Sequence, residues 1–353
     1  MLPVSRLVLT ASFCAVAWGA HAASTTEVGY MPIIPDSQVF VVLGGQTAQN
    51  PLAHTKLIEF QDGPEIVQAL LAGQLDAAYV GIGPVMVARS KGADLKVVAT
   101  NIISQISFLA LGDLAPYFKD GSPQTAFERF AKDKGHKPVI TTFPRGSVPD
   151  IVLQYWLHQV LKVSPDSVSV IYQGAAQAQQ ALLTGAVDGA AILEPIISTV
   201  LARQPDAQVV ADGSTMFPNQ PGAVLAVREK LIQQNPALVQ QLVAAQVQAT
   251  QLLRDEPDKV APTVQKYVGG GRLSPQIVLA SLKRSHDQFS ADPHRILKAT
   301  QEMYDFQRQM GTLKGTLDVA SLFDTQFYDH LSHPGAKSTE AAAVAGASAK
   351  GSH

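Results

Sequence analysis

Apolar and polar positions in the first half of the chain alternate between strand-like and helix-like spacing. Residues 56–60 and 76–80 are short, largely apolar runs with the length of a strand. Between them, residues 64–72 place apolar side chains three to four positions apart, as on one face of a helix. This order of strand, helix and strand predicts a βαβ unit.

A second copy of this pattern follows 112 residues later. The matched positions share residue type and spacing: 68–71 with 180–183, Gly73 with Gly185, Asp76 with Asp188, and 97–99 with 209–211. We therefore predict two lobes built alike, each a small parallel sheet covered by helices. Ligands bind beyond the carboxyl ends of the strands in such sheets, so two facing lobes form a cleft.

Two apolar segments, residues 106–112 and 222–227, bracket the second unit and are predicted to connect the lobes. We assign residues 23–112 and 222–333 to lobe 1, and residues 113–221 to lobe 2. The remainder of the chain has the apolar spacing of amphipathic helices, which we expect to pack on lobe 1.

Both ends of the chain differ from the rest. Residues 1–22 predict a signal peptide, with Arg6 as its positive start, an apolar stretch, and small residues at the cleavage site. The mature protein is therefore expected in the periplasm. Cys14 lies in this segment, and the bulky Phe13 before it disfavours the alternative of a lipid anchor. Residues 334–353 have no large apolar side chain and are predicted to be a disordered tail.

The composition excludes several kinds of function. The 353 residues carry a net charge of −2 without a run of Lys or Arg, so we expect no nucleic-acid partner. Cys14 is the only cysteine, which removes disulfides and thiol nucleophiles from the mature chain. The sequence also lacks histidine pairs at metal-binding spacing and a nucleophile-elbow motif. We expect a monomeric binding protein without metal, cofactor or catalytic residues.

A series of short motifs, each weak alone, occurs in a specific order and spacing. They are Val-Gly-Tyr at 28–30, Glu-Phe-Gln-Asp-Gly at 59–63, Ala-Gly-Gln-Leu-Asp at 72–76, Lys-Gly-Ala at 91–93, Leu-Lys-Val-Val-Ala at 95–99, Arg-Gly-Ser at 145–147, Gly-Ala-Val-Asp at 185–188 and Glu-Pro at 194–195. With them, residues 26–331 resemble the nitrate, sulfonate and taurine class of ABC-importer binding proteins, which includes receptors similar to thiamine-pyrimidine synthases. The resemblance implies an α/β, bilobal type II periplasmic-binding-protein fold with two hinge strands. It also implies a permease and its ATPase subunit as partners.

Four loops at strand ends are the candidate ligand-binding elements. The first, residues 30–38, is stiffened by two prolines, and its apolar side chains can cover an apolar part of a ligand. Asp36 and Ser37 either contact the ligand or cap a helix that begins at Gln38. The candidates in this loop are Tyr30, Met31, Ile33, Asp36, Ser37 and Gln38.

The second loop opens a helix at residues 81–84. Glycines allow the backbone N–H groups of Gly81, Ile82 and Gly83 to approach an anionic or carbonyl oxygen, and Pro84 suits a first helical turn. A tight strand-to-helix turn without ligand contact is the alternative.

The third loop follows a strand at residues 138–142 and offers Arg145, the backbone of Gly146 and the hydroxyl of Ser147. The planar donor fork of Arg145 matches a carboxylate or sulfonate; a solvated surface arginine is the alternative. Ser147 can cap the helix that follows, which is compatible with binding.

The fourth candidate is Glu194, which the repeat places close to the position of Pro84. An acid at the end of an apolar strand needs a partner, and a ligand, Arg145 and a backbone N–H group all satisfy this need.

These features together predict a periplasmic receptor whose lobes close over a small organic anion with an apolar part. If the ligand carries an ammonium group, Asp36 and Glu194 are available to hold it. A neutral or aromatic ligand such as a pyrimidine is one alternative, and a receptor that reports to a sensor protein is another. An enzyme on the same fold is the third, although the enzymes similar to these receptors use cysteine- or histidine-centred sites.

Overall fold

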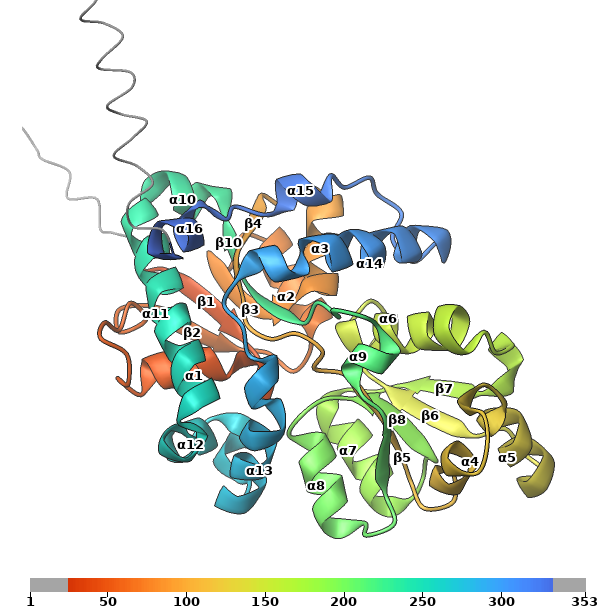
Figure 1. The fold of residues 1–353 in the computed structure, drawn as a ribbon. Coiled ribbons are helices and arrows are strands. Elements are labelled where there is room, and N and C mark those ends of the chain that lie inside the picture. The colour runs from red at the N-terminus through yellow and green to blue at the C-terminus, as the bar shows by residue number, and fades with distance from the viewer. Residues whose placement is uncertain (1–24, 333–353) are drawn as a thin grey trace, which may run out of the picture.

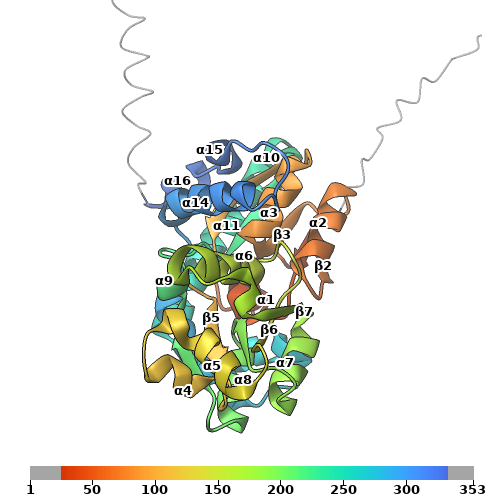
Figure 2. The ribbon, with the colours of Figure 1, turned by 90° about the vertical axis from the view of Figure 1, so that its right-hand side faces the viewer.

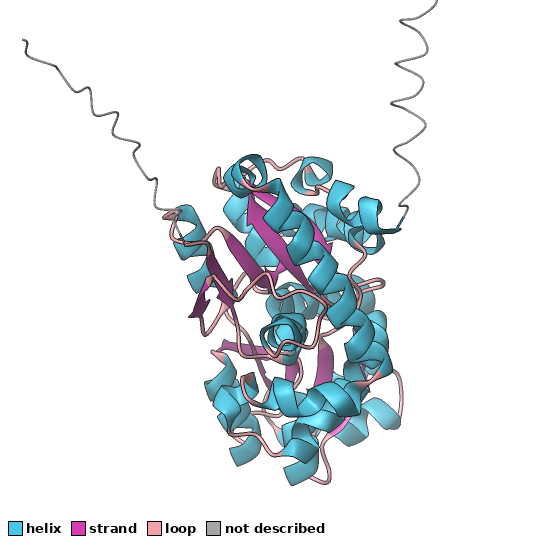
Figure 3. Ribbon diagram, turned by 90° about the vertical axis from the view of Figure 1, so that its left-hand side faces the viewer, coloured by secondary structure: helices cyan, strands magenta, loops and turns pink. Residues whose placement is uncertain are grey.

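The computed structural model describes residues 25–332, which form two α/β lobes side by side (Figure 1). The predicted signal peptide and the predicted C-terminal tail lie outside the described residues. Each lobe has one five-stranded sheet with helices on both faces, as the view coloured by secondary structure shows (Figure 3). The predicted bilobal α/β architecture is therefore confirmed.

The two sheets have equivalent strand orders. The first lobe has the order β2 (Lys56–Glu59), β1 (Glu27–Tyr30), β3 (Ala77–Gly81), β10 (Ala223–Arg228), β4 (Leu95–Thr100). The second has the order β7 (Ser169–Tyr172), β6 (Val139–Thr142), β8 (Gly189–Ile192), β5 (Ser107–Ala110), β9 (Gln208–Ala211). The prediction of purely parallel sheets was wrong in one respect, because β10 and β5 each run antiparallel to both neighbours.

The repeat in the sequence has a direct structural counterpart in two aspartates. Asp76, before β3, accepts a hydrogen bond at Oδ2 from the backbone N–H of Glu27 in β1 (3.0 Å). Asp188, before β8, accepts the same bond from Val139 in β6 (2.7 Å). Each aspartate thus ties the start of the central parallel strand to its neighbour in the same sheet.

The strand β5 lies in a different sheet from the one expected. The sequence places residues 106–112 in lobe 1, but β5 pairs with β8 and β9 of the second sheet. All four of its residues are buried, as suits the interior of a sheet covered on both faces. The chain crosses between sheets at residues 101–106 and returns at residues 217–222, where Ile103 and Pro221 form a β-bridge. The remaining lobe limits stay predictions.

Helices cover the faces of both sheets. In the first part of lobe 1 these are α1 (Ser37–Leu43), α2 (Gly63–Leu71) and α3 (Ile82–Ser90). Lobe 2 has α4 (Ala115–Lys119), α5 (Ala126–Lys134), α6 (Val148–Tyr155, continued by a π-helical turn Trp156–Leu161), α7 (Ala175–Thr184), α8 (Ile196–Arg203) and α9 (Gly213–Met216).

The C-terminal helices pack on lobe 1, as predicted, and two of them also reach lobe 2. They are α10 (Glu229–Gln234), α11 (Pro236–Asp255), α12 (Pro257–Gln265), α13 (Pro275–Ser285), α14 (Leu297–Gln309), α15 (Val319–Leu322) and α16 (Gln326–Ser332). The long helix α11 packs on α1, and α13 contacts α8 of lobe 2. Helix α14 contacts α6 of lobe 2, next to which it lies in Figure 2. Within residues 25–332, no helix combines the length and apolarity needed to cross a bilayer.

Candidate functional site

A cavity of about 30 Å³ lies between the lobes. Its walls come from the ends of β1, β3, β6 and β8, the starts of the following helices, and the crossing segment. The lining residues are Met31, Ile33, Asp36, Gly63, Gly81, Pro84, Gln105, Phe143, Ser147, Val148, Pro149, Leu193 and Ala223. This is the strand-end position where two facing α/β lobes are expected to hold a ligand. The first three predicted loops contribute to this wall. The fourth candidate, Glu194, does not line it, although the residue before it, Leu193, does.

Three helix N-caps converge on this cavity: Asp36 for α1, Gly81 for α3 and Ser147 for α6. The first backbone N–H groups of a helix lack intrahelical acceptors and carry a partial positive charge. Among the described residues that line the cavity, none has a cationic side chain. The N–H groups of Ser37, Ile82 and Asp150 already bond to protein oxygens, and prolines at positions 84 and 149 have none. At the starts of α3 and α6, the N–H groups of Gly83 and Val148 therefore remain as donors for an anion.

The glycines of the second loop allow the two lobes to lie in close contact. A Cβ atom on Gly83 would lie 2.9 Å from the backbone oxygen of Gly146 and 2.6 Å from Cδ1 of Ile151. A Cβ atom on Gly81 would lie 2.9 Å from Cγ2 of Val148. The start of α3 thus packs directly on the start of α6. Gly81 lines the cavity, whereas Gly83 is buried in this contact and Ile82 is buried with its backbone N–H donating to the backbone oxygen of Gly222 (2.9 Å).

Asp36 is the one carboxyl group in the cavity wall and is fully buried. It stands at the N-cap of α1, but its side chain makes no capping bond. Instead, Oδ2 accepts a hydrogen bond from the backbone N–H of Met31 (3.0 Å), and Oδ1 lies 3.5 Å from Nδ2 of Asn101. Burial raises the pKa of Asp36 well above its ordinary value, and the two hydrogen bonds oppose this only in part.

The other polar candidates of the first loop make their contacts within lobe 1. The hydroxyl of Ser37 donates to the backbone oxygen of Ile34 (2.6 Å), and Nε2 of Gln38 donates to the backbone oxygen of Asn101 (2.7 Å). The ring of Tyr30 packs edge-on against Phe40, with ring centroids 5.7 Å apart. Met31 and Ile33 line the cavity, whereas Ser37, Gln38 and Tyr30 do not.

Arg145 is exposed and lies outside the cavity wall. Its guanidinium stacks on the ring of Tyr172, 4.2 Å from the ring centroid, which is a cation–π contact. The backbone N–H of Gly146 donates to Oδ2 of Asp150 (2.9 Å), and the hydroxyl of Ser147 accepts from the backbone N–H of Asp150 (3.4 Å). Ser147 therefore caps α6, as the sequence suggested, and also lines the cavity.

Glu194 is buried, with its carboxylate outside the cavity wall. It accepts hydrogen bonds from the backbone N–H (3.0 Å) and the hydroxyl (2.9 Å) of Ser198. Its Oε1 also forms an ion pair with Nε of Arg284 (3.1 Å), on helix α13. Burial raises the pKa of Glu194, and the bonds from Ser198 and the charge of Arg284 oppose this shift. A backbone N–H was among its predicted partners, whereas Arg284 was not.

Several residues of the cavity wall were not predicted from the sequence. Gln105 and Ala223 belong to the crossing segment and to β10, and Leu193 directly follows β8, whereas Phe143 is the first residue of the predicted third loop. Gln105 is 6% exposed, and its Oε1 has no hydrogen-bond partner. A polar residue directly before the apolar run 106–112 was the available signal for this position.

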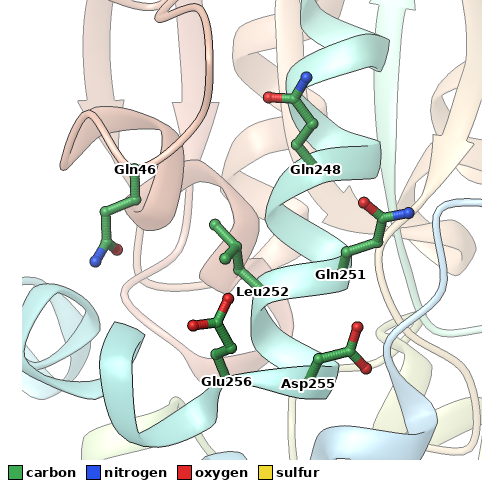
Figure 4. Close-up of a pocket in the computed structure, with 6 residues that line it drawn as sticks. All are labelled: Gln46, Gln248, Gln251, Leu252, Asp255 and Glu256. Atoms are coloured by element: carbon green, nitrogen blue, oxygen red, sulfur yellow. The ribbon is translucent and has the colours of Figure 1, made fainter.

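Two larger hollows lie on the outside of single lobes. One, of about 320 Å³, is lined mainly by polar side chains of α11, of the residue after it and of the loop after α1 (Figure 4). Its residues are Gln46, Gln248, Gln251, Leu252, Asp255 and Glu256. The other, of about 430 Å³, lies by α4 and α5 of lobe 2. Neither combines both lobes with buried polar groups, so the interlobe cavity is the candidate site. No cluster of three metal-ligating side chains occurs among residues 25–332.

The model of the NMT1-like family matches residues 19–266. A binding protein of Brucella abortus (strain 2308) is 28% identical over 212 residues, which are 59% of this chain and 60% of that protein. A protein of Bacillus subtilis (strain 168), named for binding aliphatic sulfonates, is 26% identical over 77% of this chain and 76% of its own. The matched region thus spans about 60% of the length of the Brucella relative.

Among solved structures, the fold is similar to that of an alkanesulfonate-binding protein. This is the protein SsuA from Xanthomonas axonopodis pv. citri bound to MOPS, with a TM-score of 0.66 and 22% sequence identity. The alignment covers 85% of this chain and 98% of the other. The similarity supports the bilobal arrangement independently of the sequence repeat.

Proposed function

Because the chain belongs to the NMT1-like family, we propose that it is the periplasmic substrate-binding component of an ABC importer. In this proposal it captures a small organic anion, a sulfonate or carboxylate with an apolar part, between its lobes. It then delivers the anion to a membrane permease that is driven by an ATPase subunit. The observation that carries the proposal is that the start of α3 in lobe 1 and the start of α6 in lobe 2 meet at one interlobe cavity.

The chemistry of the cavity wall supports a ligand with two different ends. The start of a helix can stabilise an anionic oxygen without a charged side chain, and Gly83 and Val148 hold the N–H groups available for this at the starts of α3 and α6. Met31, Ile33, Phe143 and Leu193 supply an apolar surface beside them. A small inorganic anion would leave that apolar surface with nothing to cover. The wall therefore favours an organic anion.

The volume of the cavity indicates that the lobes must separate for such a ligand to enter. A space of about 30 Å³ holds no more than water-sized molecules. The two crossing segments, residues 101–106 and 217–222, are the connections about which the lobes can open. A ligand that contacts both lobes would then favour the closed arrangement by its differential contacts.

A neutral or aromatic ligand is the second candidate, favoured by one specific observation. The buried carboxyl of Asp36 is in the cavity wall, while the exposed Arg145 is not. A carboxyl group beside the ligand suits an N–H donor such as that of an amino-substituted ring.

The proposed function is tested on the secreted, mature protein. Native mass spectrometry identifies any ligand that co-purifies, and a thermal-shift screen compares alkanesulfonates, carboxylates and pyrimidines. We expect an anion to raise the melting temperature, because a ligand that binds only the folded state stabilises it. Stabilisation by pyrimidines alone would replace the anion with the second candidate. N-terminal sequencing of the same sample tests cleavage after residue 22.

A further inference from the structure

Residues 288–291, between α13 and α14, run antiparallel to the first crossing segment and pair with it. Ile102 and Phe289 form a β-bridge at this place. Two backbone hydrogen bonds to residues 288–291 flank the bridge, one donated by the N–H of Ile103 (2.9 Å) and one accepted by the oxygen of Asn101 (3.1 Å). A segment of the C-terminal region thus lies against one edge of the connection between the lobes.

The other edge of the first crossing segment pairs with the second crossing segment. Ile103 and Pro221 form a β-bridge, and the N–H of Ser104 donates to the backbone oxygen of Gln220 (2.9 Å). The connection between the lobes is therefore a three-stranded ribbon, which we call the hinge ribbon. Its strands are residues 101–104, 220–223 and 288–291, of which the last does not itself cross between the lobes.

The third strand of the hinge ribbon is fixed to lobe 1. Nη1 of Arg254, in α11, donates to the backbone oxygens of Asp287 (3.1 Å) and Phe289 (2.9 Å). Phe289 is fully buried and belongs to the same apolar cluster as residues of α1, β4 and α11. Because the third strand pairs with residues 101–104, it also holds the first crossing segment on lobe 1.

The backbone is left-handed in both crossing segments, at the points where the hinge ribbon ends. The φ angle is 52° at Ser104 and 53° at Asn219. Among residues 25–332, Lys162 is the only other non-glycine residue with a positive φ. This conformation is unfavourable for residues with a Cβ atom, although asparagine tolerates it better than serine does. Two strained residues side by side at a junction are points where a bend can release strain.

We propose that residues 288–291 act as a third, non-covalent hinge strand, which keeps the hinge ribbon rigid with lobe 1 and confines the bending of the chain to Ser104 and Asn219. The inference rests on the lobe movement that the proposed function requires, and it assigns the place of that movement. In the closed arrangement both residues are left-handed. Opening relieves this strain, so ligand contacts must offset it when the lobes close.

The side chain of Gln220 spans the proposed bend. Its Oε1 accepts a hydrogen bond from the N–H of Ile106 (2.8 Å), just before β5, and its Nε2 donates to the backbone oxygen of Gly213 (3.3 Å), at the start of α9. The backbone of Gln220 belongs to the hinge ribbon, whereas both partners of its side chain lead into lobe 2. Lobe 2 is thus attached directly beyond the two left-handed residues.

An interlobe distance measured without ligand tests the inference. Gln68 in α2 and Gln180 in α7 are exposed residues at matched positions of the two lobes. Gln68→Cys and Gln180→Cys together accept one spin label in each lobe, and double electron–electron resonance measures the distance between the labels. Cys14, the only cysteine of the chain, lies in the predicted signal peptide, so the mature protein offers no other labelling site.

Ser104→Gly should raise the ratio of closed to open populations about fivefold, because glycine adopts the left-handed conformation without the penalty of a Cβ atom. Asn219→Gly should shift the ratio in the same direction by a smaller factor. Lys162→Gly is the matched control, because Lys162 is left-handed at the end of the π-helical turn within lobe 2. Population ratios equal to that of the parent in both hinge variants would overturn the two bending points.

Arg254→Ala should broaden the distance distribution, because the third strand loses its anchor on α11. Hydrogen exchange should also become faster at the N–H of Ser290, which donates to Asn101. Arg308→Ala is the matched control: Nη1 of Arg308 likewise donates to backbone oxygens, but in the loop after α14. Distance distributions that are the same in Arg254→Ala and Arg308→Ala would remove residues 288–291 from the hinge. Circular dichroism checks the folding of every variant.

The outcomes distinguish the hinge from the ligand. The predicted shifts in ligand-free protein support the hinge even if no anion binds. If ethanesulfonate or propionate shortens the distance in the parent while the hinge variants behave like the parent, the receptor stands and the hinge assignment falls. A single narrow distance that neither these anions nor the variants change overturns the lobe movement itself, and both proposals fall with it.

Discussion

Oε1 of Glu194 in lobe 2 lies 3.1 Å from Nε of Arg284, which extends from a helix packed on lobe 1. This ion pair joins the lobes beside the cavity. The carboxylate is buried, but the Arg284 side chain is 46% exposed, so solvent screens the attraction. In the proposed closure of the lobes, the pair would contribute a modest bias toward the closed arrangement.

Arg284→Ala should weaken ligand binding about two- to fivefold, the equivalent of roughly 0.5–1 kcal/mol for a partly exposed pair. Small-angle scattering of the ligand-free variant should show a larger radius of gyration than that of the parent. Lys283→Ala is the control, because Lys283 pairs with Asp258 inside lobe 1 (3.1 Å). An unchanged radius and affinity in Arg284→Ala would remove the ion pair from the closing mechanism.

Asp36 should make stability fall as the pH rises. Its folded-state pKa is raised by burial, so the folded chain keeps a proton that the unfolded chain loses near pH 4. The stabilisation is complete below the unfolded pKa and is lost as the pH rises through the folded pKa. Asp36→Asn lacks this loss. The melting temperature of the variant minus that of the parent should therefore increase from pH 4 to pH 8, by about 2–4 °C for each kcal/mol of stability that the parent loses.

Neighbouring titratable groups do not affect this comparison of the parent with Asp36→Asn. Tyr79 is also buried, and burial keeps its pKa raised, so it stays neutral in this range. Glu194, whose pKa is also raised, is present in both proteins and cancels in the difference. Parallel melting curves for parent and variant at all pH values would show that Asp36 does not titrate differently on folding.

Gly83→Ala should oppose closure, because the new Cβ would lie 2.9 Å from a backbone oxygen of lobe 2. Backbone cannot move aside as a flexible side chain does, and overpacking of this kind is unfavourable by about 1–3 kcal/mol. We expect at least a fivefold loss of affinity, measured by calorimetry. Gly174→Ala, where a Cβ would meet the flexible end of Gln177 first, is the control.

Arg145→Ala should change affinity less than twofold, because its guanidinium stacks on Tyr172 outside the cavity wall. The same substitution removes a cation–π contact of about 0.5–1 kcal/mol from lobe 2 and should lower stability by that amount. A tenfold loss of affinity would show that Arg145 turns into the cavity when ligand binds, as the sequence alone suggested.

Asp76→Ala and Asp188→Ala should destabilise the protein by similar amounts, about 1–2 kcal/mol each, since both carboxylates accept a backbone N–H of the neighbouring strand. Chemical denaturation measures both values. Asp166→Ala, with a side chain that is 93% exposed, is the control and should have little effect. A large difference between the two aspartates would contradict the structural equivalence of the lobes.

The fold can be predicted from the sequence more fully than the site, for a physical reason. The lobes are built from βαβ units whose key residues are determined locally. Gly185, at the left-handed end of α7, and Asp188, before β8, are two such residues. Ser147 was identified for the same reason, since a helix start after a strand end is a local property. Each of these residues can be assigned without knowing what lies opposite.

Residues that depend on the other lobe were harder to find. Gln105 and Leu193 line the cavity only because two distant segments meet, and Arg284 is an ordinary basic residue of an amphipathic helix until Glu194 lies against it. Arg145 shows the converse. Its chemistry suits an anion, but a sequence does not say toward which neighbour a long side chain turns.

The insertion of lobe 2 between β4 and β10 of lobe 1 makes the lobes unequal as pieces of chain. Lobe 2 holds its five strands within one continuous stretch, β5 to β9. In lobe 1, β3 and β4 are not neighbours, because β10 lies between them and is synthesised only after the whole of lobe 2. Until then both strands keep an unpaired edge, and their contacts with β10 close a long loop. Lobe 2 is therefore the natural independent folding unit, and completion of lobe 1 comes last.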